Sequence, residues 1–362
     1  MRTDMTYDMK KYIRTDLEGF AGYSACKAPE LVKTKNRIIK LDANENLYGA
    51  APTVQKAMSA FDQYHIYPDA TQFEIRRLLA EYTGVNMEQI ICGAGSDQLI
   101  DLLLRLFINP GDEVINCPPT FAMYKFYTDL NRGTVVNVPR DAGYNVNIGG
   151  IRNALTPKTK LIFIAAPNNP TGTAISKEDI RQILDLGVPT VIDEAYYEFT
   201  GQTMVTDMPR YPNLMILRTF SKWAGLAGLR VGYGLFPPVI ADYLSRIKDP
   251  YSVNIAADAA VRQTMLQREY MLETVKKIVD ERKRLYTELS KFSWLKPYPS
   301  AANFILCKLL KGKAKDVQQA LESEGILVRC FDAPMMENCL RFSVGKPEDT
   351  DALLKALGEM GE

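Results

Sequence analysis

The sequence predicts an α/β protein in which a doubly wound, mostly parallel sheet is followed by a smaller α+β domain. Short apolar runs alternate with helical stretches in the middle of the 362-residue chain, and this pattern changes after about residue 255. The hydrophobic content of 46% is ample for two cores. We expect a large domain at 50–255 and a small domain at 256–362, with an N-terminal segment at 1–49 that packs with the small domain.

The strands of the large domain are expected at five continuous apolar runs. Strands that are covered on both faces of a parallel sheet are buried, so their residues do not alternate between apolar and polar. The five runs are "EVINC" (113–117), "TVVNV" (134–138), "LIFIA" (161–165), "TVID" (190–193) and "LMILRT" (214–219).

Helix signals lie between these runs. A helix is expected at 96–108, with Ser96 as its N-cap and Asn109-Pro110-Gly111 after its end. A second helix is expected at 71–82, where Thr71 and Glu74 form the pattern of a capping box.

The C-terminal part mixes helices with strands. Residues 256–291 read as helical, and their apolar stripe consists of Val275, Ile278, Leu285 and Leu289. Strands are expected at 303–308 and 339–344, and helices at 313–324 and 347–360. This order indicates a compact α+β unit rather than a continuation of the parallel sheet.

The charge balance favours small-molecule chemistry. With 44 basic and 43 acidic residues, the chain has no basic field that would hold nucleic acid or an anionic membrane. No apolar run approaches the roughly 20 residues that a membrane span needs. The N-terminus, "MRTDMTYDMKKYIRTDLEGF", lacks the apolar region of a signal peptide. We therefore expect a cytoplasmic protein.

The cysteines and the single histidine limit which kinds of metal and catalytic site the chain can form. The six cysteines form no CxxC pair, and we expect Cys92 and Cys117, which lie in apolar runs, to be buried reduced thiols. The single histidine, His65, excludes zinc sites built from several histidines, and no GxSxG pattern accompanies it. We expect His65 to be an ordinary loop residue.

Glycines follow the first strand signal of the large domain. In open α/β sheets, ligands bind beyond the carboxyl ends of the strands. The stretch "ICGAGSDQ" (91–98) runs from a strand through glycines into a helix start, where free backbone N–H groups can hold a phosphate. Such turns are common, so this feature alone does not assign a function.

Two further loops place polar side chains at strand ends. "APNNPTG" (166–172) is an irregular loop from which Asn169 can donate a hydrogen bond. "VIDEAYY" (191–197) ends a strand with Asp193, and Tyr196 follows three residues later. An aspartate at this place is costly to bury without a partner, which favours a functional role.

The stretch "TFSKWAGLAGLRVGYG" (219–234) sets Lys222 among small and apolar residues. An enclosed amine loses hydration, so its pKa falls and it can act as a nucleophile or base near neutral pH. A phosphate cradle, a buried acid, a phenol, an amide and such a lysine together suit pyridoxal phosphate.

The sequence resembles the fold-type I pyridoxal-phosphate aminotransferases, and within them the histidinol-phosphate aminotransferase branch. The resemblance covers nearly the whole chain. It is carried by "LDANENLYG" (41–49), "YPDA" (67–70), "GAGSDQ" (93–98), "PPTFAMY" (118–124), "PNNPTG" (167–172), "DEAYYEF" (193–199), "TFSKWAGLAGLRVGYG" (219–234) and "CLRFSVG" (339–345).

The resemblance implies a role for each cofactor residue. Lys222 would carry pyridoxal phosphate covalently and act as base and acid, and Asp193 would pair with the pyridine nitrogen. Tyr196 and Asn169 would hydrogen-bond the phenolic oxygen, and Phe121 would stack on the ring. The residues expected to hold the phosphate are Gly95, Ser96, Asp97, Ser221 and Arg230.

The resemblance also implies substrate contacts and an assembly. Arg341 would hold the carboxylate of the amino-acid substrate, and Arg329 and Tyr23 would lie near the substrate end. Tyr67 would reach the phosphate of the neighbouring subunit in a homodimer with shared active sites. The chain departs from the family pattern at Trp223-Ala224, where a small residue usually precedes an aromatic one, and we expect repacking there.

The implied reaction is a ping-pong transamination in histidine biosynthesis. L-Glutamate and imidazole-acetol phosphate would give 2-oxoglutarate and L-histidinol phosphate. An aromatic amino-acid aminotransferase and a threonine-phosphate decarboxylase are alternatives, because the same cofactor residues serve all three. A regulator built on this fold would carry an added DNA-binding domain, for which the short segment before "LDANEN" leaves no room.

Overall fold

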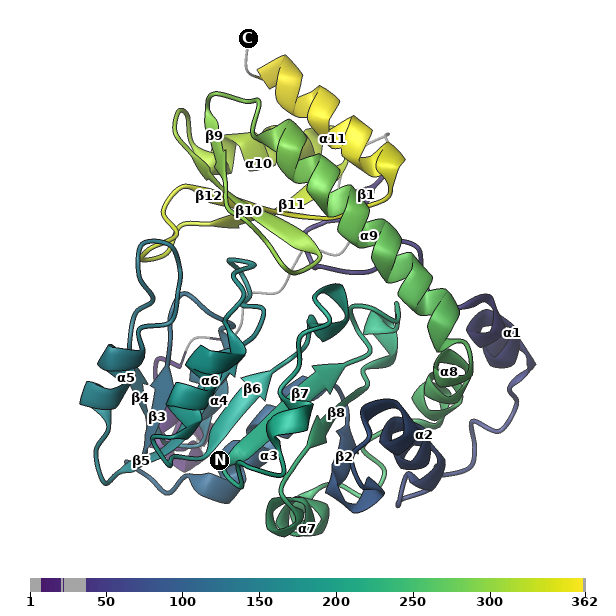
Figure 1. Cartoon of the computed structure of the whole chain (residues 1–362), viewed down its shortest axis with the longest axis vertical. Helices are drawn as coiled ribbons and strands as arrows, with labels where there is room; N and C mark the ends of the chain where they lie inside the picture. The colour runs from purple at the N-terminus through teal and green to yellow at the C-terminus, as the bar shows by residue number, and fades with distance from the viewer. Residues whose placement is uncertain (1–7, 21, 23–36, 361–362) are drawn as a thin grey trace, which may run out of the picture.

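The computed structural model describes residues 8–20, 22 and 37–360, and these form two sheets (Figure 1). The larger sheet has seven strands in the order β2-β8-β7-β6-β5-β3-β4. Its strands are β2 (Ile90–Gly93), β3 (Glu113–Asn116), β4 (Thr134–Asn137), β5 (Thr159–Ala165), β6 (Thr190–Asp193), β7 (Leu214–Thr219) and β8 (Gly232–Leu235). β8 pairs antiparallel with both of its neighbours, and the remaining pairs are parallel.

Helices cover both faces of this sheet, as the doubly wound prediction requires. One face packs against α3 (Ser96–Phe107), α4 (Met123–Leu130) and α7 (Pro238–Ile247). The other face packs against α2 (Phe73–Thr83), α5 (Ile148–Ala154), α6 (Lys177–Leu184) and α8 (Ile255–Leu266). The carboxyl ends of the parallel strands therefore meet at one edge between these layers.

The smaller sheet faces that edge (Figure 1). Its order is β1-β11-β12-β10-β9. The strands are β1 (Ile39–Leu41), β9 (Leu295–Pro297), β10 (Phe304–Leu309), β11 (Ile326–Phe331) and β12 (Cys339–Ser343). β1 comes from the N-terminal part of the chain and pairs parallel with β11. Its helices are α9 (Arg268–Leu289), α10 (Ala314–Ser323) and α11 (Pro347–Met360).

The chain passes from the large sheet to the small sheet later than the expected boundary at residue 255. α8, expected in the small domain, packs on α1 (Pro52–Ala60) and α2 beside the large sheet. α9 begins at Arg268, directly after the break at Gln267, and runs to the small sheet (Figure 1). The division into three segments remains a proposal.

The predicted strands are confirmed in position, and one differs in burial. Four of the five runs in the large sheet are buried along most of their length, but β4 is an edge strand whose residues are half-buried or exposed. Among the described residues, β4 pairs with β3 alone, so its outer edge has no neighbouring strand. In the C-terminal part, Val275, Ile278, Leu285 and Leu289 are all buried, as their spacing predicts.

Both predicted helix caps are wrong. Ser96 is the first helical residue of α3, and Gly95 (φ 80°) occupies the N-cap position, a backbone conformation that glycine adopts without strain. α2 begins at Phe73 rather than Thr71, after a left-handed Gln72. The Asp69 carboxylate accepts hydrogen bonds from the N–H of Phe73 (2.8 Å) and of Thr71 (2.8 Å), and this replaces the capping box.

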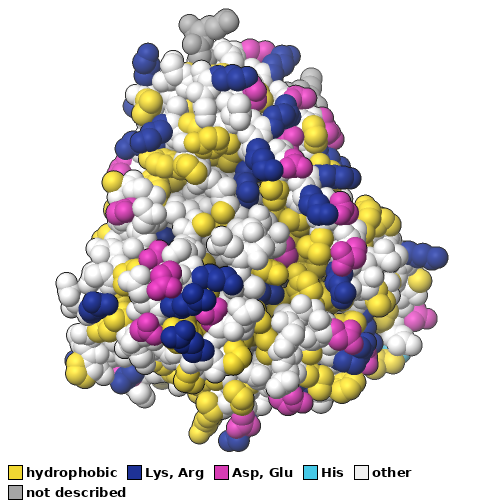
Figure 2. Space-filling model, in the orientation of Figure 1, with side chains coloured by type: hydrophobic (Ala, Val, Ile, Leu, Met, Phe, Trp, Pro, Cys, Tyr) yellow, Lys and Arg dark blue, Asp and Glu magenta, His cyan; other side chains and the backbone are white. Residues whose placement is uncertain are grey.

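The predictions for Cys92, Cys117 and His65 are confirmed. Cys92 and Cys117 are buried free thiols, and burial raises their pKa to about 12 and about 11. His65 lies in an exposed loop. On the face shown in Figure 2, acidic and basic side chains are interspersed rather than gathered by sign. Among the described residues, no helix combines the length and the apolar character of a bilayer span.

Candidate active site

A cavity of about 500 Å³ lies at the carboxyl ends of the large-sheet strands and is closed on its other side by the small sheet. It brings together side chains from loops that are far apart in the sequence. Of the predicted residues, those that line it are Ser96, Asp97, Phe121, Asn169, Asp193, Tyr196, Ser221, Lys222, Arg230, Arg329 and Arg341.

Lys222 lies in the loop that follows β7, with its amine in the cavity. Nζ donates a hydrogen bond to the backbone carbonyl of Ala43, at 3.0 Å. Burial, and to a lesser extent the nearby Arg341 guanidinium, lowers the pKa of Lys222 to about 8. An amine with this pKa is partly neutral near physiological pH and can act as a nucleophile or base. The predicted enclosed amine is confirmed.

Asp193 ends β6 and is a buried residue of the cavity lining. The hydroxyl of Tyr124 donates to its Oδ2 at 2.7 Å, and the N–H of Ala195 donates to its Oδ1 at 3.0 Å. Burial raises the pKa of Asp193 to about 6, while these two hydrogen bonds act in the opposite direction. The carboxylate is thus held in one orientation and is ready to pair with a cationic partner in the cavity.

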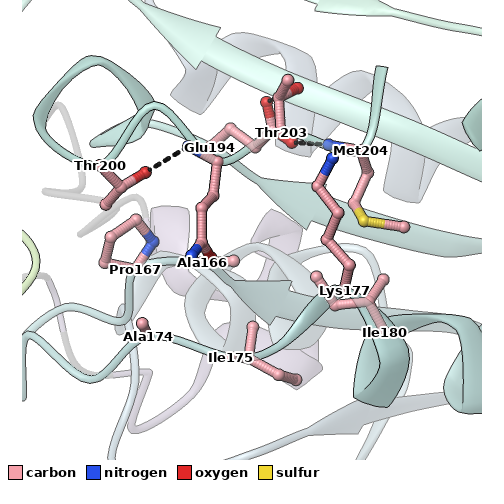
Figure 3. Close-up of a pocket in the computed structure, with 11 residues that line it drawn as sticks. Ala166, Pro167, Ala174, Ile175, Lys177, Ile180, Glu194, Thr200, Thr203 and Met204 are labelled. Carbon is pink, nitrogen blue, oxygen red and sulfur yellow. Dashed lines mark hydrogen bonds between the residues drawn. The ribbon is translucent and has the colours of Figure 1, made fainter. Parts of the chain in front are cut away.

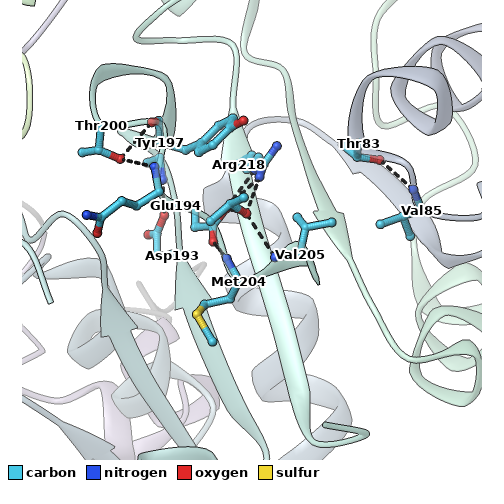
Figure 4. A network of polar contacts seen from close by, with 12 residues as sticks. Thr83, Val85, Asp193, Glu194, Tyr197, Thr200, Met204, Val205 and Arg218 are labelled. Atoms are coloured by element: carbon cyan, nitrogen blue, oxygen red, sulfur yellow. Dashed lines mark hydrogen bonds and ion pairs between the residues drawn. The ribbon is translucent and has the colours of Figure 1, made fainter. Parts of the chain in front are cut away.

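The residue after Asp193 anchors this strand end from the opposite face. Glu194 accepts from Nε and Nη2 of the buried Arg218 at 3.0 and 2.9 Å, and from the N–H of Met204 at 2.7 Å (Figure 4). The Arg218 guanidinium also lies 3.8 Å from the ring centre of Tyr197. Because consecutive strand residues point to opposite faces, this network fixes the backbone that carries Asp193 without entering the cavity.

The start of α3 has the features of an anion-binding site. The first N–H groups of this helix have no partner within the helix, and its dipole favours negative charge there. Arg230, itself left-handed (φ 53°), reaches the same place and binds the Asp97 carboxylate at 2.8 Å. A Cβ atom on Gly95 would lie 2.6 Å from the Arg230 Nη2, so a larger residue would displace this guanidinium.

Two arginines enter from the small sheet. Arg341 on β12 and Arg329 on β11 are paired in register. Arg341 is buried and donates to Oδ1 of Asn169 and to the carbonyl of Asp42, both at 2.6 Å. Its guanidinium offers the planar pair of donors that carboxylates and phosphates accept.

Two predicted residues that the structure describes lie outside the cavity lining. Tyr67 is 76% exposed and stacks on Tyr251 with ring centres 4.4 Å apart. Gly95 lies behind Arg230 rather than at the surface of the cavity. Tyr23 falls outside the described residues.

The sequence reasoning missed several residues that the fold brings to the site. Ala43, Asn44 and Glu45 line the cavity, and Tyr124 contacts Asp193. The signals for them were present in "LDANENLYG" and "PPTFAMY", but neither stretch showed which side chain would face the cavity. Their roles depend on contacts with distant parts of the chain.

The loop after Lys222 packs tightly on the N-terminal segment. A Cβ atom on Gly225 (φ 67°) would lie 2.5 Å from the backbone of Gly49. Trp223 is fully buried, with its ring 6.1 Å from that of Tyr82 and 5.8 Å from that of Phe220. The departure at Trp223-Ala224 is therefore accommodated in the core, as expected.

A second, much smaller cavity lies beside the network of Glu194. Ala166, Ile175, Thr203 and Met204 are among its lining residues (Figure 3). Its volume of about 20 Å³ has room for about one water molecule. It cannot hold a cofactor, so the larger cavity is the candidate site.

Comparisons with known proteins identify the family and the relatives of the chain. Residues 36–357 match the family described as aminotransferase class I and II. The chain is 99% identical over 358 residues to a histidinol-phosphate aminotransferase from Dehalococcoides mccartyi, covering 99% of this chain and 100% of that protein. It is 46% identical to the enzyme of that name from Roseiflexus castenholzii, covering 90% of each. The crystal structure of histidinol-phosphate aminotransferase from Sinorhizobium meliloti in complex with pyridoxal-5'-phosphate is 26% identical and superposes with a TM-score of 0.88 over 98% of both chains.

Proposed function

Because the chain belongs to the class I and II aminotransferase family, we propose that it is a histidinol-phosphate transaminase. It uses pyridoxal phosphate to transfer the amino group of L-glutamate to imidazole-acetol phosphate, which yields 2-oxoglutarate and L-histidinol phosphate in histidine biosynthesis. The observation that carries this proposal is the buried amine of Lys222, whose pKa is lowered to about 8, in a cavity that also holds the buried acid Asp193.

The residues of the cavity fit pyridoxal phosphate. Lys222 supplies the amine for covalent attachment, and Asp193 supplies a buried anion for the pyridine nitrogen. The start of α3 and Arg230 supply N–H donors for the phosphate. When bound, the cofactor supplies an electron sink that makes the substrate Cα–H acidic.

The protein's own groups then orient the substrate and move the proton. Arg341 binds the carboxylate of the amino acid and so sets which bond at Cα lies toward Lys222. The neutral Lys222 amine removes the Cα proton and returns it at the next stage of the transfer. Asp193 keeps its pyridine partner protonated, and Tyr196 donates to the phenolic oxygen.

The substrate assignment is tested by comparing substrates with and without their phosphate group. We expect the aminated enzyme to react with imidazole-acetol phosphate at least about tenfold more efficiently in kcat/KM than with imidazole-acetol, because a charged hydrogen bond contributes about 1.5–3 kcal/mol. Phenylpyruvate serves as the comparison for the aromatic aminotransferase reaction. Equal turnover with and without the phosphate would contradict the assignment, and a preference for phenylpyruvate would replace it.

The homodimer with shared active sites is a further part of the proposal. Tyr67 lies on an exposed apolar and aromatic surface rather than in its own chain's cavity, which suits a residue that contributes to the partner's site. Tyr251, on which Tyr67 stacks, is also exposed, and so are Tyr64, Ile66 and Phe73 in the same stretch of chain as Tyr67. The cytoplasmic location remains a prediction from the sequence.

Tyr67→Phe is expected to weaken cofactor retention by about 2- to 12-fold, which corresponds to one neutral hydrogen bond of about 0.5–1.5 kcal/mol. Equilibrium dialysis measures cofactor retention, and sedimentation measures assembly. Tyr64→Phe, which removes an exposed hydroxyl from the same loop, is the matched control and should leave retention unchanged. A fully active monomer would refute the shared site.

A further inference from the structure

Asn44 occupies an unusual place between the two sheets. It is 2% exposed, with a left-handed backbone (φ 54°) that asparagine tolerates better than most residues. Its Nδ2 donates to the hydroxyl oxygen of Tyr196 at 2.9 Å. Its Oδ1 accepts from the hydroxyl of Ser343 at 3.0 Å, and its N–H donates to the same Ser343 oxygen at 2.9 Å. Its carbonyl accepts from Nδ2 of Asn303 at 2.9 Å.

The two residues before Asn44 also contact groups of the site, through their backbone carbonyls. The carbonyl of Asp42 accepts from Arg341, and the carbonyl of Ala43 accepts from Lys222. Three consecutive residues thus contact three different groups of the site. Ser343 and Arg341 are two residues apart on β12, so they share one face of that strand.

We infer that Asn44 is a positioning residue that holds the Tyr196 hydroxyl in its working orientation and ties it to the strand that carries Arg341. This inference rests on the proposed function, in which Tyr196 donates to the phenolic oxygen of the cofactor. No step of that function assigns a role to Asn44.

The direction of the hydrogen bond between Asn44 and Tyr196 explains how Asn44 acts on the Tyr196 hydroxyl. Because Nδ2 of Asn44 donates, Tyr196 accepts at this contact and does not spend its own proton there. A hydroxyl that accepts one hydrogen bond becomes a stronger donor in the next, since linked hydrogen bonds polarise one another. Asn44 therefore strengthens the donation from Tyr196 and limits its direction.

The test uses the visible absorption of the holoenzyme during a pH titration. Donation from Tyr196 stabilises negative charge on the phenolic oxygen of the cofactor. It therefore favours the deprotonated form of the bound cofactor, which is the group that absorbs visible light. Asn44→Gly removes the side chain while glycine tolerates the left-handed backbone. We expect this variant to raise the apparent pKa of the absorption, in the same direction as Tyr196→Phe but by less. All charged groups that line the cavity stay in place.

A double substitution distinguishes an effect of Asn44 on the Tyr196 hydroxyl from an unspecific loss of order in the site. In Asn44→Gly/Tyr196→Phe, the apparent pKa should equal that of Tyr196→Phe alone, because Asn44 acts only through the missing hydroxyl. Asn213→Ala is the matched control. It removes an amide that donates to the carbonyls of Leu184 and Val188, at the opposite end of β7 from the cavity, and should leave the apparent pKa unchanged.

An unchanged apparent pKa in Asn44→Gly, or a shift that adds fully to that of Tyr196→Phe, would overturn the inference. If Asn44→Gly does not fold, Ser343→Ala decides, because it frees Asn44 from β12 while keeping its amide. A smaller rise in that variant supports the inference, and no rise overturns it. A wild-type protein without a pH-dependent cofactor band would instead refute the proposed function.

Discussion

Lys222→Met is expected to reduce turnover by about 10³-fold or more, because the variant loses both the covalent attachment point and the base that moves the Cα proton. Methionine keeps an unbranched side chain of similar length, so the fold should persist. Steady-state kinetics measures the loss. Borohydride reduction of the wild-type holoenzyme followed by peptide mapping should place the cofactor on the peptide that contains Lys222.

The control for this substitution is Lys248→Met. Lys248 is also partly buried with a lowered pKa, but it donates to Ser252 and lies outside the cavity lining. Its substitution should leave turnover and the borohydride adduct unchanged. An adduct on any lysine other than Lys222 would refute the assignment.

The pKa of Lys222 also predicts a pH dependence. Attachment of the cofactor to the cofactor-free protein requires the neutral amine, so its rate should rise as the pH increases from 7 and level off above about 8. An ordinary exposed lysine would keep gaining neutral amine up to about pH 10.4. Stopped-flow absorbance measures this rate, and a rise that continues past pH 9.5 would contradict the burial of this amine.

Asp193→Asn is expected to reduce turnover by about 10²-fold while leaving the protein folded. An amide keeps the size of the side chain but cannot balance the charge of a protonated pyridine nitrogen, so the electron sink weakens. A loss of less than about threefold, under 1 kcal/mol, would show that Asp193 is structural. Asp207→Asn is the matched control, since Asp207 is a buried carboxylate that pairs with Arg181 at 2.8 Å, outside the cavity lining.

The same variant has a second readout in the cofactor-free protein. Burial raises the folded-state pKa of Asp193 to about 6, so the ionised carboxylate costs stability above that pH, and this cost fades as the pH falls from 6 toward 4. Asp193→Asn should therefore stabilise the cofactor-free protein at pH 7–8 by on the order of 1–2 kcal/mol. Denaturant unfolding at pH 7.5 and pH 4.5 measures this, and equal effects at both values would contradict it.

The sequence by itself determined the five parallel strands of the large sheet and the loops that gather at their carboxyl ends, but not the antiparallel strand β8. Continuous apolar runs mark parallel strands, and the rule that their carboxyl ends meet at one edge brings Ser96, Asn169, Asp193 and Lys222 together. The lowered pKa of Lys222 was also predictable, because its neighbours in the chain are small and apolar. These features depend on local pattern and strand direction, which a single sequence shows directly.

Local sequence signals predicted the first residues of helices and the burial of the edge strand less well. The capping box at Thr71 failed because the Asp69 carboxylate accepts from the N–H groups of Thr71 and Phe73. The N-cap at Ser96 failed because the turn needs a residue with positive φ, which Gly95 supplies. β4 has the sequence of a buried strand but lies at the sheet edge, since its place in the strand order is not written in its own residues.

Only the tertiary structure decided the substrate end of the cavity and its link to the cofactor end. Asn44 meets Ser343 across 299 residues of chain and Tyr196 across 152, and Arg341 meets Asn169 across 172. No periodicity or spacing encodes such pairs, because they exist only once β1 has joined the small sheet and that sheet has closed over the strand ends of the large one.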